Sequence, residues 1–128
     1  EMPAVADPDV AVALWEAARG AGRAHRGIGL SVDAFYRGVL DLGFTTYADA
    51  GAICVEMECS ALFVIGAMRR VRTGAIVAID GDARAASAGE HHPDRDLVRA
   101  AVEREIDVAL GAAARLAAAR GAAEGAST

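Results

Sequence analysis

The segment Gly51-Ala52-Ile53-Cys54-Val55-Glu56-Met57-Glu58-Cys59-Ser60-Ala61-Leu62-Phe63 carries the clearest fold signal in this chain. Residues 52–57 form a short apolar run between Gly51 and Glu58, a pattern typical of a buried strand. From Glu58 to Arg70, apolar residues continue most of the way round a helical projection, which predicts a helix buried on most sides. A strand that passes directly into a helix indicates an α/β fold.

Three elements are predicted before this unit. Asp7-Pro8-Asp9 has the residues of a helix start, with a capping Asp and then Pro at the first helical position, and the helix should end near residues 20–22. The alternation of apolar residues in 25–33 predicts a strand. Residues 40–51 should hold a short helix, which would lead into the strand that begins at Ala52.

Two further elements are predicted after it. Thr73 to Ile79 is almost entirely apolar and rich in β-branched residues, which suits a central strand. A long helix should run from about Asp94 to Arg120, and residues 121–128 should fray. Its apolar stripe consists of Val98, Val102, Ile106, Ala109, Ala113 and Leu116. The layout is α/β, with a central sheet and helices outside it.

The last helix and the first residues both suggest a piece of a longer protein. At 1.5 Å per residue, a helix over 94–120 is on the order of 40 Å long and needs more protein to lie against. The chain opens at Glu1 rather than Met, and residues 3–8 follow without any leader. We therefore expect a truncated domain.

Composition excludes several classes of protein. The chain has 128 residues, 54% of them hydrophobic, and a formal net charge of −5, which argues against a general nucleic-acid or anionic-membrane binder. No apolar run approaches the roughly 20 residues that span a bilayer, so we expect a cytoplasmic protein. Cys54 and Cys59 suit two reduced, core-like thiols better than a disulfide framework or a zinc site.

Glu56 and Glu58 are the first candidates for chemistry. Residues two apart at a strand end point the same way, so both carboxylates can face one pocket. A carboxylate can accept hydrogen bonds from both hydroxyls of a cis-diol such as that of ribose. The alternative is that Glu58 caps the following helix, whose N-terminus favours a negative charge.

Three other segments allow a functional and a structural interpretation. Phe35-Tyr36 can stack on a flat ring or belong to the core. Asp80 and Asp82 flank a glycine after an apolar strand, where an acid can exchange a proton with a leaving group or simply form an Asp-Gly turn. His91-His92 beside Asp94 suits a solvated stretch better than a metal site, and we expect no metal.

Taken together, these segments resemble the nucleoside phosphorylase family, the superfamily of purine nucleoside and uridine phosphorylases. The likeness covers nearly the whole chain and is greatest to the uridine phosphorylase-like branch. In chain order its segments are Ala4-Val5-Ala6-Asp7-Pro8, Gly27-Ile28, Ser31-Val32-Asp33-Ala34-Phe35-Tyr36, Val55-Glu56-Met57-Glu58-Cys59-Ser60-Ala61-Leu62-Phe63 and Arg72-Thr73-Gly74.

The resemblance implies a fold and a set of site residues. The fold would be a central mixed sheet flanked by helices, with residues 1–128 as the C-terminal part of a single domain. Met57 and Glu58 would bind the ribose, and Glu56 would help to shape the same wall. Phe35 would lie against the base. Asp80 would be the catalytic acid that protonates the leaving base.

The chain departs from the family pattern in the base pocket and the phosphate site. Val39 and Asp41 stand where uridine-specific relatives carry a Gln and an Arg, and Gly81 stands where simple counting places the purine-specific acid. Base specificity is therefore open. The resemblance implies that the phosphate ligands of the family lie upstream, because its Gly-Asp-Pro loop and its phosphate-binding arginines, including one in an Arg-Gly-Thr-like turn, have no match in this sequence.

The function implied is phosphorolysis of a nucleoside to free base and ribose 1-phosphate, with inorganic phosphate as co-substrate and no cofactor. The partners would be nucleoside and phosphate, with neither nucleic acid nor membrane, and the complete protein would be a homo-oligomer. The fragment alone should be inactive. Two alternatives remain: a nucleosidase that uses water in place of phosphate, and a non-catalytic binding or assembly piece.

Overall fold

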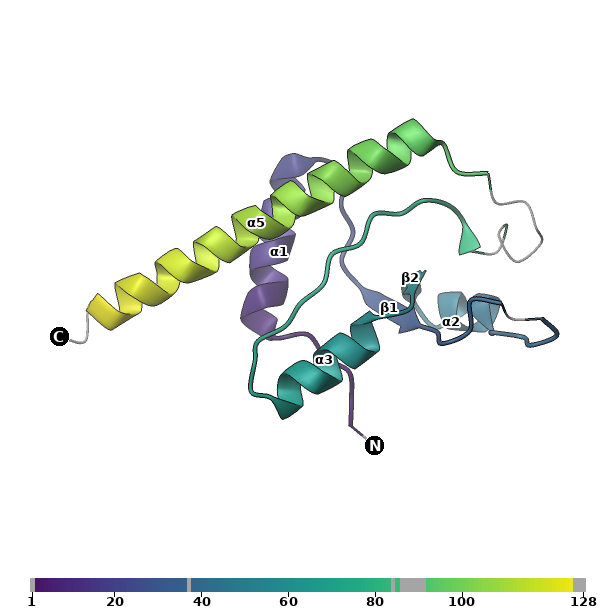
Figure 1. The fold of residues 1–128 in the computed structure, drawn as a ribbon, viewed down its shortest axis with the longest axis horizontal. Coiled ribbons are helices and arrows are strands. Elements are labelled where there is room, and N and C mark those ends of the chain that lie inside the picture. Colours follow the sequence, from purple (N-terminus) through teal and green to yellow (C-terminus); the bar gives the residue numbers. More distant parts are fainter. Residues whose placement is uncertain (1, 37, 84, 86–91, 126–128) are drawn as a thin grey trace.

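The computed structural model describes residues 2–36, 38–83, 85 and 92–125. Helices and strands follow one another along the chain, with a pair of strands at one side and a long final helix across the molecule (Figure 1). The elements are α1 (Pro8–Ala21), β1 (Ile28–Ser31), α2 (Phe44–Asp49), β2 (Ala52–Glu56), α3 (Cys59–Met68) and α5 (Arg95–Gly125).

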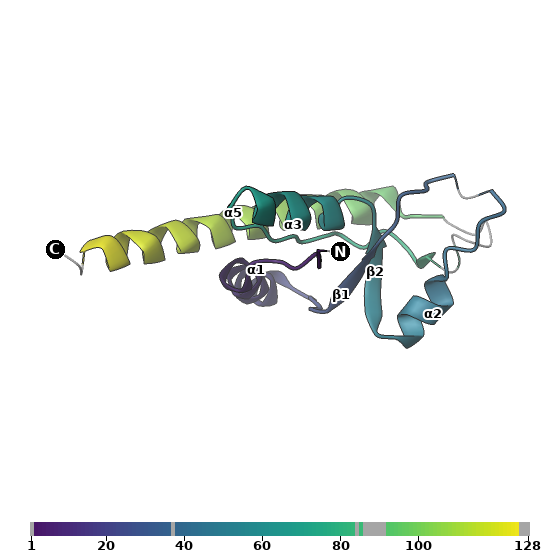
Figure 2. The ribbon, with the colours of Figure 1, turned by 90° about the horizontal axis from the view of Figure 1, so that it is seen from below.

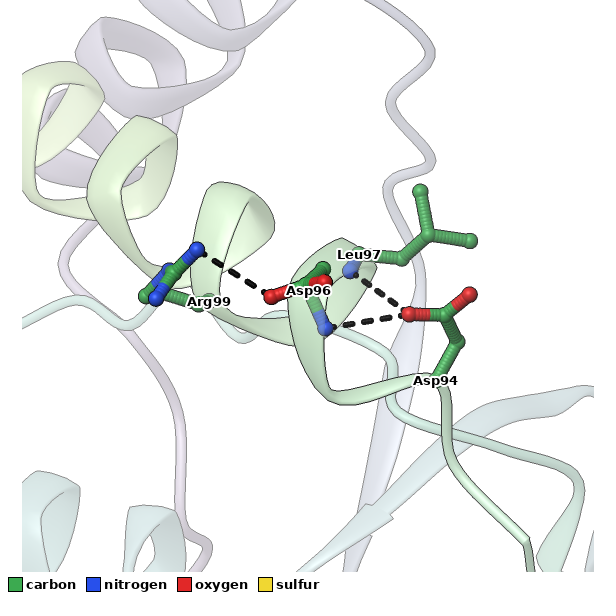
Figure 3. Close-up of polar contacts among 4 residues, drawn as sticks. All are labelled: Asp94, Asp96, Leu97 and Arg99. Carbon is green, nitrogen blue, oxygen red and sulfur yellow. Dashed lines mark hydrogen bonds and ion pairs between the residues drawn. The ribbon is translucent and has the colours of Figure 1, made fainter.

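Both long helices begin at an aspartate that caps them. Asp7 Oδ1 accepts hydrogen bonds from the amides of Asp9 and Val10 at 3.0 and 3.1 Å, and Pro8 is the first residue of α1, as the sequence predicts. Asp94 Oδ1 accepts from the amides of Asp96 and Leu97 at 3.0 and 3.2 Å (Figure 3). Each cap satisfies amides that have no partner within their own helix.

Helix α5 packs across α1, and this contact holds the buried apolar residues. Ala13 of α1 and Val108 and Ala112 of α5 are 7%, 5% and 1% exposed. Small side chains allow the two helices to approach closely. With 31 residues, α5 is about 46 Å long at 1.5 Å per residue, and its last turns project past the other elements (Figures 1 and 2). It continues past Arg120, the end expected from the sequence.

The sheet of the described residues is a parallel pair, β1 and β2, with α2 in the connection between them. The register pairs Ile28 with Ala52 and Ser31 with Glu56, with one irregularity after Ile28. The α/β class is confirmed, whereas the central mixed sheet is present here only as these two parallel strands. The C-terminal ends of both strands therefore lie side by side.

The predicted central strand at Thr73 to Ile79 is wrong for the described chain. Residues 71–80 are extended but belong to neither strand pair nor helix. Two of their backbone groups bond elsewhere: the Thr73 carbonyl accepts from the Asp7 amide at 2.7 Å, and the Ala78 amide donates to Glu105 Oε2 at 3.0 Å. A β-strand forms when its backbone hydrogen-bonds to the backbone of a neighbouring strand. Here the hydrogen bonds of the segment go instead to the Asp7 amide at the start of α1 and to the Glu105 side chain of α5.

The segment passes so close to two helices that glycine is required. A Cβ at Gly74 would lie 2.5 Å from Val10 Cγ1, and one at Gly66 would overlap the Thr73 side chain. α3 ends just before the segment, with Arg70 in the left-handed region at φ 56°. The amides of Arg70 and Val71 bond the carbonyls of Ala67 and Gly66, which closes the helix.

The expectation that α3 is buried on most sides is also wrong for this chain. Leu62, Ile65 and Met68 are 45%, 58% and 70% exposed. β1 and Thr73, at the start of the extended segment, contact this helix, and its large side chains Leu62, Ile65 and Met68 nevertheless stay largely exposed. No helix in the described residues is both long enough and apolar enough to cross a membrane.

Candidate functional site

The candidate site is the turn between β2 and α3, where Met57 and Glu58 connect the strand end at Glu56 to the helix start at Cys59. Because Ser31 pairs with Glu56 in the parallel ladder, the end of β1 lies directly beside this turn. The Val32 amide extends the pairing with a 2.9 Å hydrogen bond to the Glu56 carbonyl. The turn therefore follows directly from the ends of two strands that are hydrogen-bonded to each other.

Glu56 uses its side chain to hold the turn. Its Oε2 accepts hydrogen bonds from the amides of Glu58 and Cys59 at 2.7 and 2.6 Å, and its Oε1 accepts one from the Ser31 hydroxyl. Ser31 Oγ also accepts from the Ser60 amide at 3.0 Å. Three consecutive amides at the start of α3 are thus satisfied by Glu56 and Ser31, and we call these two side chains the clamp.

These contacts set the ionisation of the groups around the clamp. Burial raises the pKa of Glu56, but the hydrogen bonds from Ser31, Cys59 and Glu58 outweigh it, so the net pKa lies below the ordinary value of 4.5. Burial, and then the charge of Glu56, raise the pKa of Cys54. Burial and a hydrogen bond with Glu56 raise the pKa of Cys59 to about 12. Both cysteines are free, as expected from the sequence, but they are half-buried rather than core residues.

Glu58 differs from Glu56 in having its carboxylate open to solvent. It occupies the cap position of α3, but its side chain bonds none of the helix amides. Its Oε2 accepts a single 3.3 Å hydrogen bond from the Met57 amide. Glu58 therefore occupies the N-cap position without a capping hydrogen bond, and Glu56 accepts the hydrogen bonds of the Glu58 and Cys59 amides in its place.

The other predicted residues lie on separate segments. Phe35 follows β1 and meets Tyr36 edge-on, with ring centroids 5.0 Å apart. Phe35 is 75% and Tyr36 92% exposed, so the interpretation as core residues does not hold in this chain. Asp80 is exposed at the end of the extended segment. The structure thus unites Glu56, Met57 and Glu58 on one turn and places Phe35 and Asp80 on two other loops.

Several arginines are engaged away from this turn. Arg19 and Arg26 lie over the Trp15 ring, 5.8 and 5.5 Å from its centroid. Arg72 forms an ion pair with Asp9 at 3.5 Å. In the described residues, no group of three or more His, Cys, Asp or Glu is arranged to hold a metal ion, and His91 lies outside those residues.

Sequence reasoning missed Ser31 and Glu105. Ser31 completes the clamp, and Glu105 of α5 holds the backbone two residues before Asp80. A signal for Ser31 was present, because the N-cap residue of α3 is Glu58 rather than one of the residues that cap helices well, Ser, Thr, Asp or Asn. Another residue therefore had to accept the hydrogen bonds of the first amides of α3. The strand register, which pairs Ser31 with Glu56, shows that these two residues do so.

The comparison with protein families decides the assignment. The family model described as "Phosphorylase superfamily" matches residues 1–119. This chain belongs to the phosphorylase superfamily. The family predicted from the sequence is therefore confirmed.

Named relatives support the same family. The chain is 37% identical over 119 residues to a purine nucleoside phosphorylase of Plasmodium falciparum, covering 91% of this chain and 48% of that protein. It is 32% identical over 118 residues to a uridine phosphorylase of Treponema pallidum, covering 80% and 46%. The chain spans about half the length of the curated relatives it matches.

A solved structure agrees. The purine nucleoside phosphorylase of Toxoplasma gondii in complex with immucillin-H superposes with a TM-score of 0.76 at 30% identity. The match covers 90% of this chain and 47% of that one. The greater likeness to the uridine branch that the sequence suggested is not supported, because the purine nucleoside phosphorylase of P. falciparum matches at higher identity and coverage.

Proposed function

We propose that this chain forms the ribose- and base-binding side of a nucleoside phosphorylase, as the C-terminal half of that enzyme. The observation that supports the proposal is the turn at Glu58. Its neighbour Glu56 is occupied by the clamp, whereas the Glu58 carboxylate is exposed and has one weak internal partner. A carboxylate in that state can accept hydrogen bonds from a sugar diol.

The chemistry proposed is attack of phosphate on the anomeric carbon of the nucleoside while the base departs. The sugar becomes positively charged in the transition state, so catalysis depends on holding ribose, phosphate and base in line and on placing negative charge near the sugar. In this proposal, Met57 and Glu58 hold the ribose and Glu56 forms its wall. Phosphate is the co-substrate, and no cofactor is needed.

The phosphate site would come from the other half of the enzyme. Of the arginines in this chain, Arg19 and Arg26 stack on Trp15 and Arg72 pairs with Asp9. Those contacts support a structural role for the three side chains. We therefore propose that this chain alone does not bind phosphate productively, and that the isolated chain is inactive.

For the base we propose a purine. Val39 is fully exposed, and Asp41 Oδ1 accepts the Gly43 amide at 2.8 Å, so neither offers a donor to the carbonyls of uracil. Two relatives named for purine substrates, a purine nucleoside phosphorylase and a guanosine phosphorylase from Halorubrum lacusprofundi, are 37% and 33% identical. Phe35 would stack on the purine and Asp80 would protonate it as it leaves.

We also propose that the complete enzyme is a homo-oligomer. Val102, Ile106 and Leu110 of α5 are 42%, 53% and 64% exposed, and at 3.6 residues per turn they point away from the face on which Val108 and Ala112 are buried against α1. Apolar area of this kind is normally covered in an assembled protein. The remaining half of the fold and a second subunit would share it.

The decisive assay uses the enzyme that contains both halves of the fold, with inosine and uridine, in the presence and absence of phosphate. We expect inosine to be cleaved to hypoxanthine and ribose 1-phosphate only when phosphate is present. Free ribose without phosphate would instead show a nucleosidase. Cleavage of neither nucleoside would show a binding or assembly role.

The acid is tested by comparing Asp80→Asn with Asp82→Asn in the same enzyme. A general acid contributes about 10²–10⁴-fold, so Asp80→Asn should lower kcat for inosine within that range. A large loss of activity in Asp82→Asn and none in Asp80→Asn would show that Asp82, on the other side of Gly81, is the general acid. A preference for uridine that neither change affects would overturn the purine assignment.

A further inference from the structure

We infer that Ser31 and Glu56 are positioning residues that set how strongly the ribose 2′-hydroxyl contributes to catalysis, by fixing the backbone that carries Glu58. The inference rests on the proposed function, because it concerns how the proposed ribose ligand is held. Neither side chain needs to touch the substrate. Their effect would pass through the amides of Glu58, Cys59 and Ser60.

Two hydrogen bonds to Glu56 fix the direction of the backbone at Glu58. Its amide donates to Glu56 Oε2 at 2.7 Å, and the next amide, of Cys59, donates to the same oxygen at 2.6 Å. Hydrogen bonds to a charged acceptor are the strong ones, and two on one oxygen fix the peptide planes on both sides of Glu58. The Cα of Glu58 is therefore held, while its side chain is left free to meet a ligand.

Ser31 connects the Glu56 carboxylate to the start of α3. Its hydroxyl donates to Glu56 Oε1 and accepts from the Ser60 amide at 3.0 Å, so it ties the carboxylate to the first turn of α3. Ser31 is the last residue of β1 and Glu56 the last residue of β2, and the two are paired in the ladder. The clamp thus transfers the rigidity of the sheet to the turn.

Glu56 itself would not distinguish ribose from deoxyribose. Its two oxygens already accept three hydrogen bonds, which leaves little capacity for a diol. Glu58 accepts one bond at 3.3 Å and is exposed. A displaced Glu58 backbone would weaken bonds to the ribose hydroxyls and leave contacts to the base and phosphate unchanged.

The test measures kcat/KM for inosine and 2′-deoxyinosine in the enzyme with both halves of the fold, for wild type, Ser31→Ala and Ser31→Thr. Loss of a hydrogen bond to a charged group should lower the ratio of kcat/KM for inosine to that for 2′-deoxyinosine by roughly tenfold or more in Ser31→Ala. Ser31→Thr keeps the hydroxyl and should restore the ratio. Thr45→Ala on the exposed face of α2 serves as the control and should leave it unchanged.

Each other outcome has a definite meaning. An equal fall for both nucleosides, or no fall, shows a merely structural role and overturns the inference while the proposed function stands. A wild type that cleaves no nucleoside overturns the proposed function and the inference with it. If Ser31→Ala does not fold, Ser31→Cys keeps the shape with a weaker donor and should lower the ratio by a smaller factor, and an unchanged ratio there overturns the inference.

Discussion

The α1–α5 contact and the β2–α3 turn are held together by different forces. The helix pair buries small apolar residues, with Ala112 only 1% exposed, and an exposed ion pair joins Arg115 and Glu16 at 3.9 Å. The turn has large apolar neighbours that are exposed and a polar clamp of four hydrogen bonds. Packing fixes the first region, and directed hydrogen bonds fix the second.

The two regions should tolerate different kinds of substitution. Close packing penalises any added volume, whatever its chemistry. A hydrogen-bonded turn depends on particular atoms and on their charge, and it leaves the side chain between the bonded amides free. A residue intended to meet a ligand is better placed on the second kind of scaffold, which is where Glu58 lies.

Overpacking the helix contact should have the largest effect on stability. Ala112→Leu adds three carbons at a buried position, which should lower the free energy of unfolding by about 1–3 kcal/mol in urea titrations. Ala114→Leu, two residues on and exposed, controls for the change in helix propensity and should have little effect. Equal effects of both variants would show that the contact is not close-packed.

Exchanging each glutamate for glutamine should separate the two roles. Glu58→Gln should lower kcat/KM of the complete enzyme roughly tenfold or more, because it removes a charged acceptor, and should leave the melting temperature unchanged. Glu56→Gln should lower the melting temperature, because it removes the charge from three hydrogen bonds. Unchanged catalytic efficiency in Glu58→Gln would contradict ribose binding by this side chain.

Acid should weaken the clamp in a defined direction. Because the folded pKa of Glu56 lies below the ordinary 4.5, the folded state binds fewer protons than the unfolded state, and the clamp stabilises the fold fully above pH 4.5. That contribution should disappear as the pH falls through the lower folded pKa. Unfolding free energies measured across this range should fall more for wild type than for Glu56→Gln.

A matched control uses a glutamate outside the clamp. Glu103→Gln, on an exposed position of α5, should leave the acid dependence of wild type in place. If Glu56→Gln and Glu103→Gln change it equally, the dependence belongs to the overall charge rather than to the clamp.

The smallest effect should be on thiol chemistry. The thiolate is the reactive form, and burial together with Glu56 raises the pKa of Cys59 to about 12, so alkylation by iodoacetamide at pH 8 should be much slower than in urea-unfolded protein. Glu56→Gln removes the nearby charge and should raise the rate. Timed alkylation with mass spectrometry measures it, and equal rates in folded and unfolded wild type would contradict the raised pKa.

Much of the local structure could be predicted from short signals. Asp7-Pro8 marks the start of α1, the apolar run before Glu56 marks β2, and helical spacing after Asp94 marks α5, because caps and periodicity act within one or two turns. The stripe predicted for α5 is wrong as its packing face, because the residues that α5 buries are Val108 and Ala112, while Val102 and Ile106 of the stripe are exposed. The resemblance also indicated the correct superfamily and the Glu56–Glu58 turn as candidate site. The predicted roles of Phe35, Met57, Glu58 and Asp80 stay predictions.

The structural predictions failed where a segment contacts residues that are distant in the sequence. Residues 73–79 have the composition of a central strand, but their backbone bonds Asp7 and Glu105. Periodicity reports which residues avoid water and does not say which element, if any, covers them. For the same reason α3 has the sequence of a buried helix and a largely exposed surface in this chain.

The amino-acid sequence was enough to predict most of the helices and strands, the superfamily and the two carboxylates at the strand end. It could not predict that Glu56 holds the turn while Glu58 is open, which depends on contacts between distant segments. That division depends on the register that pairs Ser31 with Glu56 across 25 positions of sequence. Two glutamates two residues apart have the same local chemistry, and they acquire different tasks because the neighbouring strand supplies a hydroxyl to one of them.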